Sequence, residues 1–164
     1  MALLFGPRLG LNVDKMIRLA LIHDLAEARV GDLTPADRVS SAEKRERERI
    51  AFAEIVEPLP EGQALDDVWR EYEAGASPEA RVVRQLDKLE MVLQALEYER
   101  QYGRHLDRAR PRARRRVSAD AEPERGAVEI DGWANQFWDS ARGALTEPLL
   151  IEFYDYLYAL RPRW

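Results

Sequence analysis

Five apolar residues recur between positions 82 and 96 at alternating spacings of four and three, which fits one face of an α-helix and excludes a strand. They are Val82, Leu86, Leu89, Leu93 and Leu96. Asp87, Gln94 and Tyr98 fall just beside this stripe, so we expect a polar row along the edge of the core. Nearly every other segment also has helical periodicity, and the sequence therefore predicts an all-α fold.

Caps and stop signals predict the remaining helices. A helix from about Asp14 to Val30 is expected, capped by Asn12 or Asp14 and stopped by Gly31. It is apolar nearly all round, which places it at the centre of a bundle. Further helices are expected after the capping box Ser40 to Glu43 through Ile55, around Leu65 to Tyr72 before Gly75, from Ser77 and Pro78, near Trp133 to Ala144, and near Glu147 to Leu160.

The length and composition limit the number of domains and the classes of protein to which the chain can belong. With 164 residues, 46% of them hydrophobic, the chain is long enough for one domain over residues 1–164, a single helical bundle. It is too polar for a membrane protein, and a net charge of -5 argues against general nucleic-acid binding. The absence of cysteine excludes disulfides, thiolate zinc sites and cysteine nucleophiles, and it fits a reducing cytoplasm.

Residues 108–132 interrupt the helical pattern. An arginine-rich run, Arg108 to Arg116, is followed by an acidic stretch without an apolar period, which predicts a mobile insertion. The arginines could contact phosphate or RNA. The acidic stretch favours a solvated loop that neutralises its own charge.

The run from Leu19 to Glu27 sets His23, Asp24 and Glu27 inside otherwise apolar, helix-forming sequence. Burying such groups without partners is costly, so they point to a metal or a substrate rather than to packing. His23 and Glu27 are four residues apart and share a helical face, with Asp24 at its edge. The alternative is a buried histidine that is hydrogen-bonded to its neighbours.

The donor set suits a hard or borderline divalent cation such as Mn, Co, Mg, Fe or Zn, because it combines an imidazole with carboxylates and has no sulfur. Asp87, on a later helix beside the core stripe, could close the same coordination sphere. A cation with open positions lowers the pKa of a bound water, which favours hydrolysis. Lys88 is expected at the surface, about 100° away from Asp87 around the helix.

The pair His23-Asp24 followed by the distant Asp87 resembles the HD-domain metal-dependent phosphohydrolases, whose ligand pattern is His, then His-Asp, then Asp. Residues 18–37, 69–73 and 85–99 are similar to the branch of HD-domain-containing protein 2 and the YfbR-like 5'-deoxynucleotidases. The resemblance implies an HD-domain bundle that acts as a homodimer on deoxynucleoside 5'-monophosphates.

The same resemblance implies roles for individual residues. His23, Asp24 and Asp87 would be metal ligands, while Glu27 and Asp32 would position or deprotonate the attacking water or protonate the leaving ribose oxygen. This division suits the in-line displacement of a phosphomonoester, which needs a metal beside an acid and a base.

The first histidine of the family pattern has no counterpart here. The chain has only His23 and His105, and His105 follows Asp87. Residues 1–5, before Gly6 and Pro7, are typical of the last turns of an apolar helix, so we expect an upstream segment that carries the first histidine. Two alternatives therefore stay open: a non-catalytic HD scaffold or nucleotide-binding module, and a phosphohydrolase for another nucleotide phosphoester.

Overall fold

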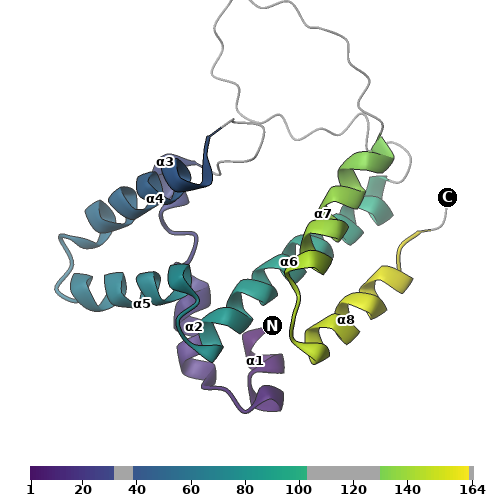
Figure 1. Cartoon of the computed structure of the whole chain (residues 1–164), viewed down its shortest axis with the longest axis horizontal. Helices are drawn as coiled ribbons and strands as arrows, with labels where there is room; N and C mark the ends of the chain where they lie inside the picture. Colours follow the sequence, from purple (N-terminus) through teal and green to yellow (C-terminus); the bar gives the residue numbers. More distant parts are fainter. Residues whose placement is uncertain (32–38, 103–129, 163–164) are drawn as a thin grey trace, which may run out of the picture. The chain divides into compact units, whose positions relative to one another are not determined.

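A computed structural model describes residues 1–31, 39–102 and 130–162 (Figure 1). Every regular element within these ranges is a helix and none is a strand, which confirms the predicted all-α fold. None of the helices in the described ranges combines the length and the apolar character that a membrane span requires. The chain divides into two compact units, Met1–Leu86 and Asp87–Trp164, and the single domain over 1–164 stays a prediction.

The first unit begins with helix α1 (Ala2–Phe5), the 3-10 helix η1 (Pro7–Leu9) and helix α2 (Val13–Ile22). The Asn12 side chain accepts a hydrogen bond from the Lys15 amide at 3.1 Å, so Asn12 caps α2 as predicted. Met16 and Leu19 are fully buried along one face of α2, whereas Leu21 is 76% exposed. The exposure of Leu21 contradicts the expectation that this apolar helix lies at the centre of a bundle.

The predicted continuous helix from Asp14 to Val30 is also wrong, because α2 ends at Ile22 and α3 spans Glu27–Val30. Between the two helices, the Leu25 and Glu27 amides donate to carbonyl oxygens three residues back rather than four. Such bonds wind the chain more tightly than an α-helix. His23 and Glu27 therefore do not share one face of a regular α-helix, as their spacing of four predicted. Gly31, at φ 78°, ends α3 as predicted.

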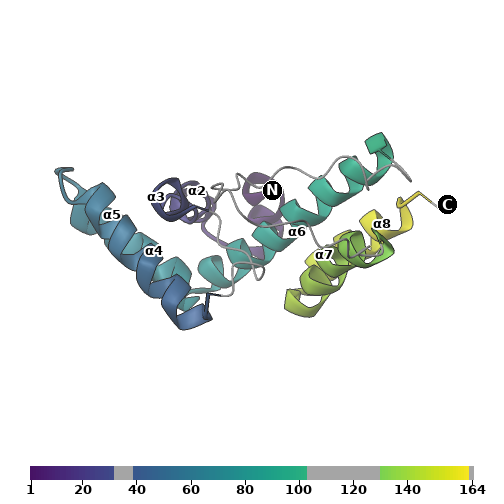
Figure 2. The ribbon, with the colours of Figure 1, turned by 90° about the horizontal axis from the view of Figure 1, so that it is seen from above.

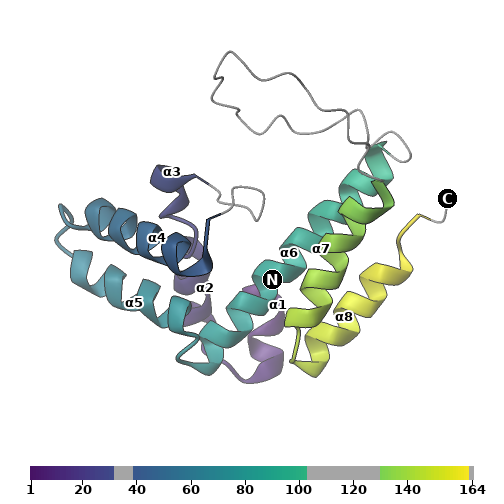
Figure 3. The ribbon, with the colours of Figure 1, turned by 45° about the horizontal axis from the view of Figure 1, so that its top comes forward.

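Helices α4 (Ser41–Val56) and α5 (Gly62–Ala74) pack side by side (Figures 1 and 3). The Ser40 hydroxyl accepts the Glu43 amide at 3.2 Å and caps α4 as predicted. The rings of Phe52 and Trp69 stack with their centroids 4.9 Å apart, at the centre of the core between the helices. Ala26, Ala51 and Val56 complete the buried part of this core. Ala26 thus attaches the start of α3 to the α4–α5 pair.

Helix α6 (Pro78–Tyr102) is the long helix predicted from the apolar stripe, and Figure 2 shows it unbroken. The Ser77 hydroxyl accepts the Ala80 amide at 3.1 Å at its start. The stripe residues are buried except Leu93, which is half-buried beside the fully buried Val92. The expected polar row of Asp87, Gln94 and Tyr98 is half-buried, as residues at the edge of a core should be.

The second unit adds α7 (Ile130–Ala144) and α8 (Pro148–Ala159) to the second half of α6. Helix α7 starts three residues before the predicted Trp133, so the expected insertion over 108–132 extends too far at its end. Residues 108–129 of that insertion lie outside the described part of the chain, as does His105.

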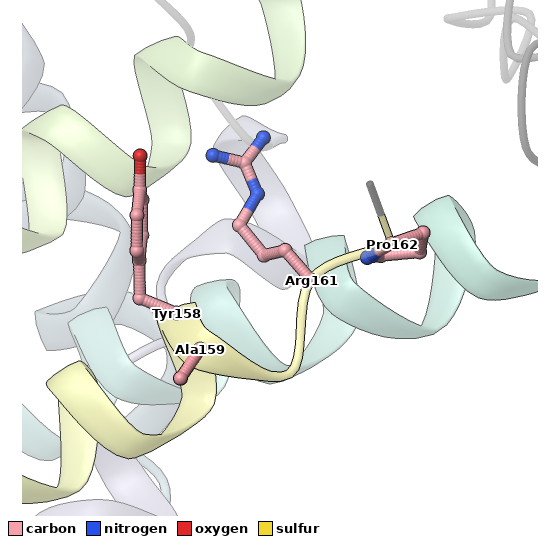
Figure 4. A pocket seen from close by; sticks show the side chains of 4 residues that line it. All are labelled: Tyr158, Ala159, Arg161 and Pro162. Carbon is pink, nitrogen blue, oxygen red and sulfur yellow. The ribbon is translucent and has the colours of Figure 1, made fainter. Parts of the chain in front are cut away.

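Arg161 connects the end of α8 to α6. Its guanidinium pairs with the buried Glu99 at 2.7 Å and lies over the rings of Trp138 and Tyr158, 4.9 and 5.1 Å from their centroids. Figure 4 shows Tyr158 and Arg161 beside an open hollow of about 260 Å³. Because Glu99 already neutralises Arg161, this hollow offers no free cation to an anionic ligand.

Candidate metal centre

The three residues predicted as metal ligands come together in the structure. His23, Asp24 and Asp87 each offer one ligand atom, and these atoms all lie within 4.8 Å of one another. His23 follows the last residue of α2, Asp24 lies in the turn after it, and Asp87 lies on α6. His23 and Asp87 are half-buried and Asp24 is exposed, so the group has both a protein side and a solvent side.

The contacts of the His23 ring fix which nitrogen carries the proton. Nδ1 lies 2.8 Å from the main-chain oxygen of Ala20, and a carbonyl oxygen only accepts, so we assign the hydrogen to Nδ1. In the neutral ring this leaves the Nε2 lone pair facing Oδ2 of Asp24 at 2.9 Å. A cation placed between these two atoms would find one donor from each residue.

This arrangement fits a divalent cation. A histidine that binds a metal usually donates its other ring N–H to a carbonyl or a carboxylate, which orients the ring, and Ala20 supplies that acceptor here. The neighbouring donors are carboxylate oxygens and none of the three ligand atoms is sulfur, which suits a hard or borderline divalent cation.

Helix α5 holds His23 in place from one side. The Trp69 indole Nε1 donates to the main-chain oxygen of His23 at 3.3 Å, and the Tyr72 ring lies 5.0 Å from the imidazole, centroid to centroid. Both aromatic residues are buried, and residues three apart project from the same side of a helix. The backbone and the ring of His23 are therefore both fixed by α5.

Lys15 ties α2 to its neighbours. Its ammonium lies 2.6 Å from Glu71 on α5 and 3.6 Å from Glu79 on α6. The hydrogen bond to Glu71 is the main cause of the raised pKa of Lys15. Burial alone would raise the pKa of Glu71, but hydrogen bonds from Lys15 and Ser77 and the charge of Lys15 together lower it. Both shifts mean that folding favours the ionised pair.

Asp87 already has a cationic neighbour. The Lys88 ammonium lies 2.9 Å from Oδ2 of Asp87, which corrects the expectation that Lys88 points away from that carboxylate. Helix geometry sets the direction in which each side chain leaves the backbone, about 100° apart for Asp87 and Lys88. The four-carbon stem of lysine is flexible and long enough to bring the ammonium back to Asp87 across that angle.

Of the two residues predicted to transfer protons, Glu27 lies in the described part of the chain and Asp32 does not. Glu27 is the first residue of α3, is half-buried and is not part of the group of three ligand atoms.

Trp69 and Tyr72, which position His23, were not predicted from the sequence as part of the centre. Trp69 and Tyr72 look like ordinary core residues in the helix pattern, and nothing in their spacing points to His23. The available signal was their place in segment 69–73, one of the three segments that resemble the deoxynucleotidases.

Comparison with known proteins shows named relatives. The human 5'-deoxynucleotidase HDDC2 is 37% identical over 153 residues, which cover 92% of this chain and 62% of the human protein. The zebrafish (Danio rerio) protein of that name is 47% identical over 98 residues, or 58% of this chain and 49% of the relative. The Saccharomyces cerevisiae 5'-deoxynucleotidase YBR242W is 43% identical over 97 residues, which cover 56% of this chain and 41% of the yeast protein. The chain thus spans about three fifths of the human relative's length.

The sequence model described as HD domain matches residues 1–128. The matched range contains His23, Asp24 and Asp87 together with the α5 residues that support them. Because the match covers well over half of the 164 residues, this chain belongs to the HD-domain family.

Proposed function

We propose that this protein is a metal-dependent phosphohydrolase that cleaves deoxynucleoside 5'-monophosphates into deoxynucleoside and inorganic phosphate. The observation that carries the proposal is the His23 ring, whose Nδ1 is bound to Ala20 while Nε2 faces a carboxylate. The relatives named 5'-deoxynucleotidase support the substrate class.

Membership of the HD-domain family implies dependence on a divalent cation. His23, Asp24 and Asp87 would hold this cation, with Mn, Co or Mg as the first candidates and Fe or Zn as further ones. When bound, such a cation neutralises the equatorial oxygens of a phosphoryl group and activates the attacking water.

The chain itself supplies orientation and proton transfer. Ala20, Trp69 and Tyr72 keep the His23 ring and backbone in one geometry, so little reorganisation is needed when a ligand binds. Glu27 follows the buried Ala26, which packs into the core between α4 and α5. From there, Glu27 would take a proton from the attacking water or deliver one to the leaving 5'-oxygen, and Asp32 would share this task.

Phosphate release tests this function. The purified chain should release inorganic phosphate from deoxynucleoside 5'-monophosphates when Mn, Co or Mg is added, and Asp24→Ala should abolish the release. Asp14→Ala is the matched control, because Asp14 is an exposed carboxylate in the first turn of α2 and should leave activity unchanged. Activity that survives in Asp24→Ala would show that the site is wrong.

The same assay separates the alternatives. Metal binding without phosphate release from any nucleotide would favour the non-catalytic scaffold or nucleotide-binding module. Release from a phosphodiester probe such as bis(p-nitrophenyl) phosphate, with none from monophosphates, would favour another phosphoester as substrate. The homodimer and the cytoplasmic location expected from the sequence stay predictions.

A further inference from the structure

Lys88 differs from the other basic residues of helix α6, all of which the structure describes. The other three donate to main-chain oxygens: Arg81 to Gly75 at 3.2 Å, Arg84 to Glu73 at 2.8 Å and Arg100 to Leu160 at 3.5 Å. Lys88 instead forms an ion pair with a carboxylate, that of Asp87. Among these four cations, it is therefore the one that neutralises a proposed metal ligand.

The pair requires the lysine to fold back. Consecutive helix residues project about 100° apart and do not normally face each other. The 2.9 Å contact between Nζ and Oδ2 is nevertheless formed, with 36% of the Lys88 side chain and 23% of the Asp87 side chain exposed. A partly buried carboxylate is stabilised by a nearby positive charge, and Lys88 supplies that charge to Asp87.

We propose that Lys88 is the internal counter-ion of the metal centre. Its ammonium group holds the Asp87 carboxylate when no divalent cation is bound and competes with that cation for the same carboxylate. Lys88 is thus a positioning residue that acts through Asp87 and limits the affinity for metal. This inference rests on the proposed function, which assigns Asp87 as a ligand.

Two effects of opposite sign follow for Lys88→Met. Without the competing ammonium, the dissociation constant for Mn²⁺ should fall about fivefold, which corresponds to the roughly 1 kcal/mol upper range of an exposed ion pair. Without a counter-ion for Asp87, the metal-free protein should lose stability, and its Tm in EDTA should fall by about 2 to 4 °C. A purely structural role for Lys88 would produce only the second effect.

The test is a titration of metal-stripped protein with Mn²⁺, in which electron paramagnetic resonance measures free Mn²⁺. Lys88→Arg keeps the positive charge and should bind Mn²⁺ no more tightly than wild type. Lys44→Met is the matched control, because Lys44 is 34% exposed and pairs with Glu48 at 3.5 Å on α4. It should leave the affinity for Mn²⁺ unchanged.

The outcomes separate this inference from the function on which it rests. If wild type binds Mn²⁺ and Lys88→Met binds it equally or less tightly, the inference is overturned while the metal centre stands. If neither protein binds Mn²⁺, both are overturned. Binding by Lys88→Met alone would support the inference strongly, and equal tightening in Lys44→Met would overturn it. If circular dichroism shows that Lys88→Met is unfolded, Lys88→Gln is measured by the same criteria.

Discussion

The indole Nε1 of Trp69 donates a hydrogen bond to the main-chain carbonyl oxygen of His23 at 3.3 Å. This carbonyl belongs to the residue directly after the last residue of α2, where main-chain oxygens lack partners within the helix. The bond therefore satisfies a helix end and fixes the backbone of a proposed metal ligand. Helix α5 contributes to the centre in this way without supplying a ligand.

Trp69→Phe tests this relationship. The variant keeps an aromatic ring to stack on Phe52 but loses the donor to His23, so the free energy of unfolding should fall by about 1 kcal/mol. Because His23 is then held less firmly, the affinity for Mn²⁺ should also fall severalfold. Urea denaturation and Mn²⁺ titration measure the two effects.

Trp138→Phe is the control for Trp69→Phe. Trp138 is fully buried, and its Nε1 donates to Glu99 at 3.2 Å. The control should lose a similar amount of stability with no change in metal affinity. Equal loss of metal affinity in both variants would contradict the positioning role of Trp69.

Divalent metal should stabilise the folded chain. A ligand that binds only the folded state adds about 2.7 kcal/mol at a concentration one hundred times its dissociation constant. Thermal unfolding should therefore shift upward in Mn²⁺ relative to EDTA. Asp24→Asn should remove this shift but leave the Tm in EDTA nearly unchanged, because 60% of the Asp24 side chain is exposed. A shift that persists in Asp24→Asn would assign the stabilising metal to another site.

Glu73→Gln should stabilise the protein at neutral pH. Burial raises the pKa of Glu73, and the carboxylate of Glu48 raises it further, while Arg84, Arg45 and Lys44 oppose the shift. An acid whose folded pKa is raised contributes stability that is present below its ordinary value of 4.5 and is lost as the pH rises through the folded pKa. The variant should gain up to about 1 kcal/mol at pH 7. Urea denaturation at pH 4 and pH 7 should show that gain only at the higher pH.

Glu71→Gln should have the opposite effect. Burial would raise the pKa of Glu71, but hydrogen bonds from Lys15 and Ser77 and the charge of Lys15 together lower it. The contribution of Glu71 is therefore present above the ordinary value of 4.5 and is lost as the pH falls through the folded pKa. Removing the charge should cost about 0.5 to 1 kcal/mol at pH 7. Acid titration of stability by circular dichroism should show wild type and variant converging at low pH. A constant difference down to low pH would contradict the ionic origin.

Local signals predicted the helix ends well. Asn12 and Ser40 accept amide hydrogen bonds at the starts of their helices, and Gly31 and Gly75 end theirs at positive φ, because capping depends on residues close in sequence. The break at His23 lacked such a signal, since no glycine or proline occurs near it. There the Trp69 bond comes from a residue 46 positions away.

The proposed ligands were easier to predict than their supports. His23, Asp24 and Asp87 are polar residues in or beside apolar sequence, which makes them conspicuous. Tyr72 is one aromatic residue among many, and its contact with the imidazole depends on how α5 packs. The Lys88 contact depends on a side-chain conformation that helix periodicity does not specify.

Because α6 is one continuous helix from Pro78, the position of Asp87 along it and around its axis depends on the number of residues that precede Asp87 in the helix. Ala80 and Val83 are buried and fix the rotation of α6 about its axis. Inserting or deleting one residue between Val83 and Asp87 would turn the carboxylate by about 100° and move it by about 1.5 Å along the axis. Chain-length differences among active relatives should therefore fall in the connections between helices and not in the stretch from Val83 to Asp87.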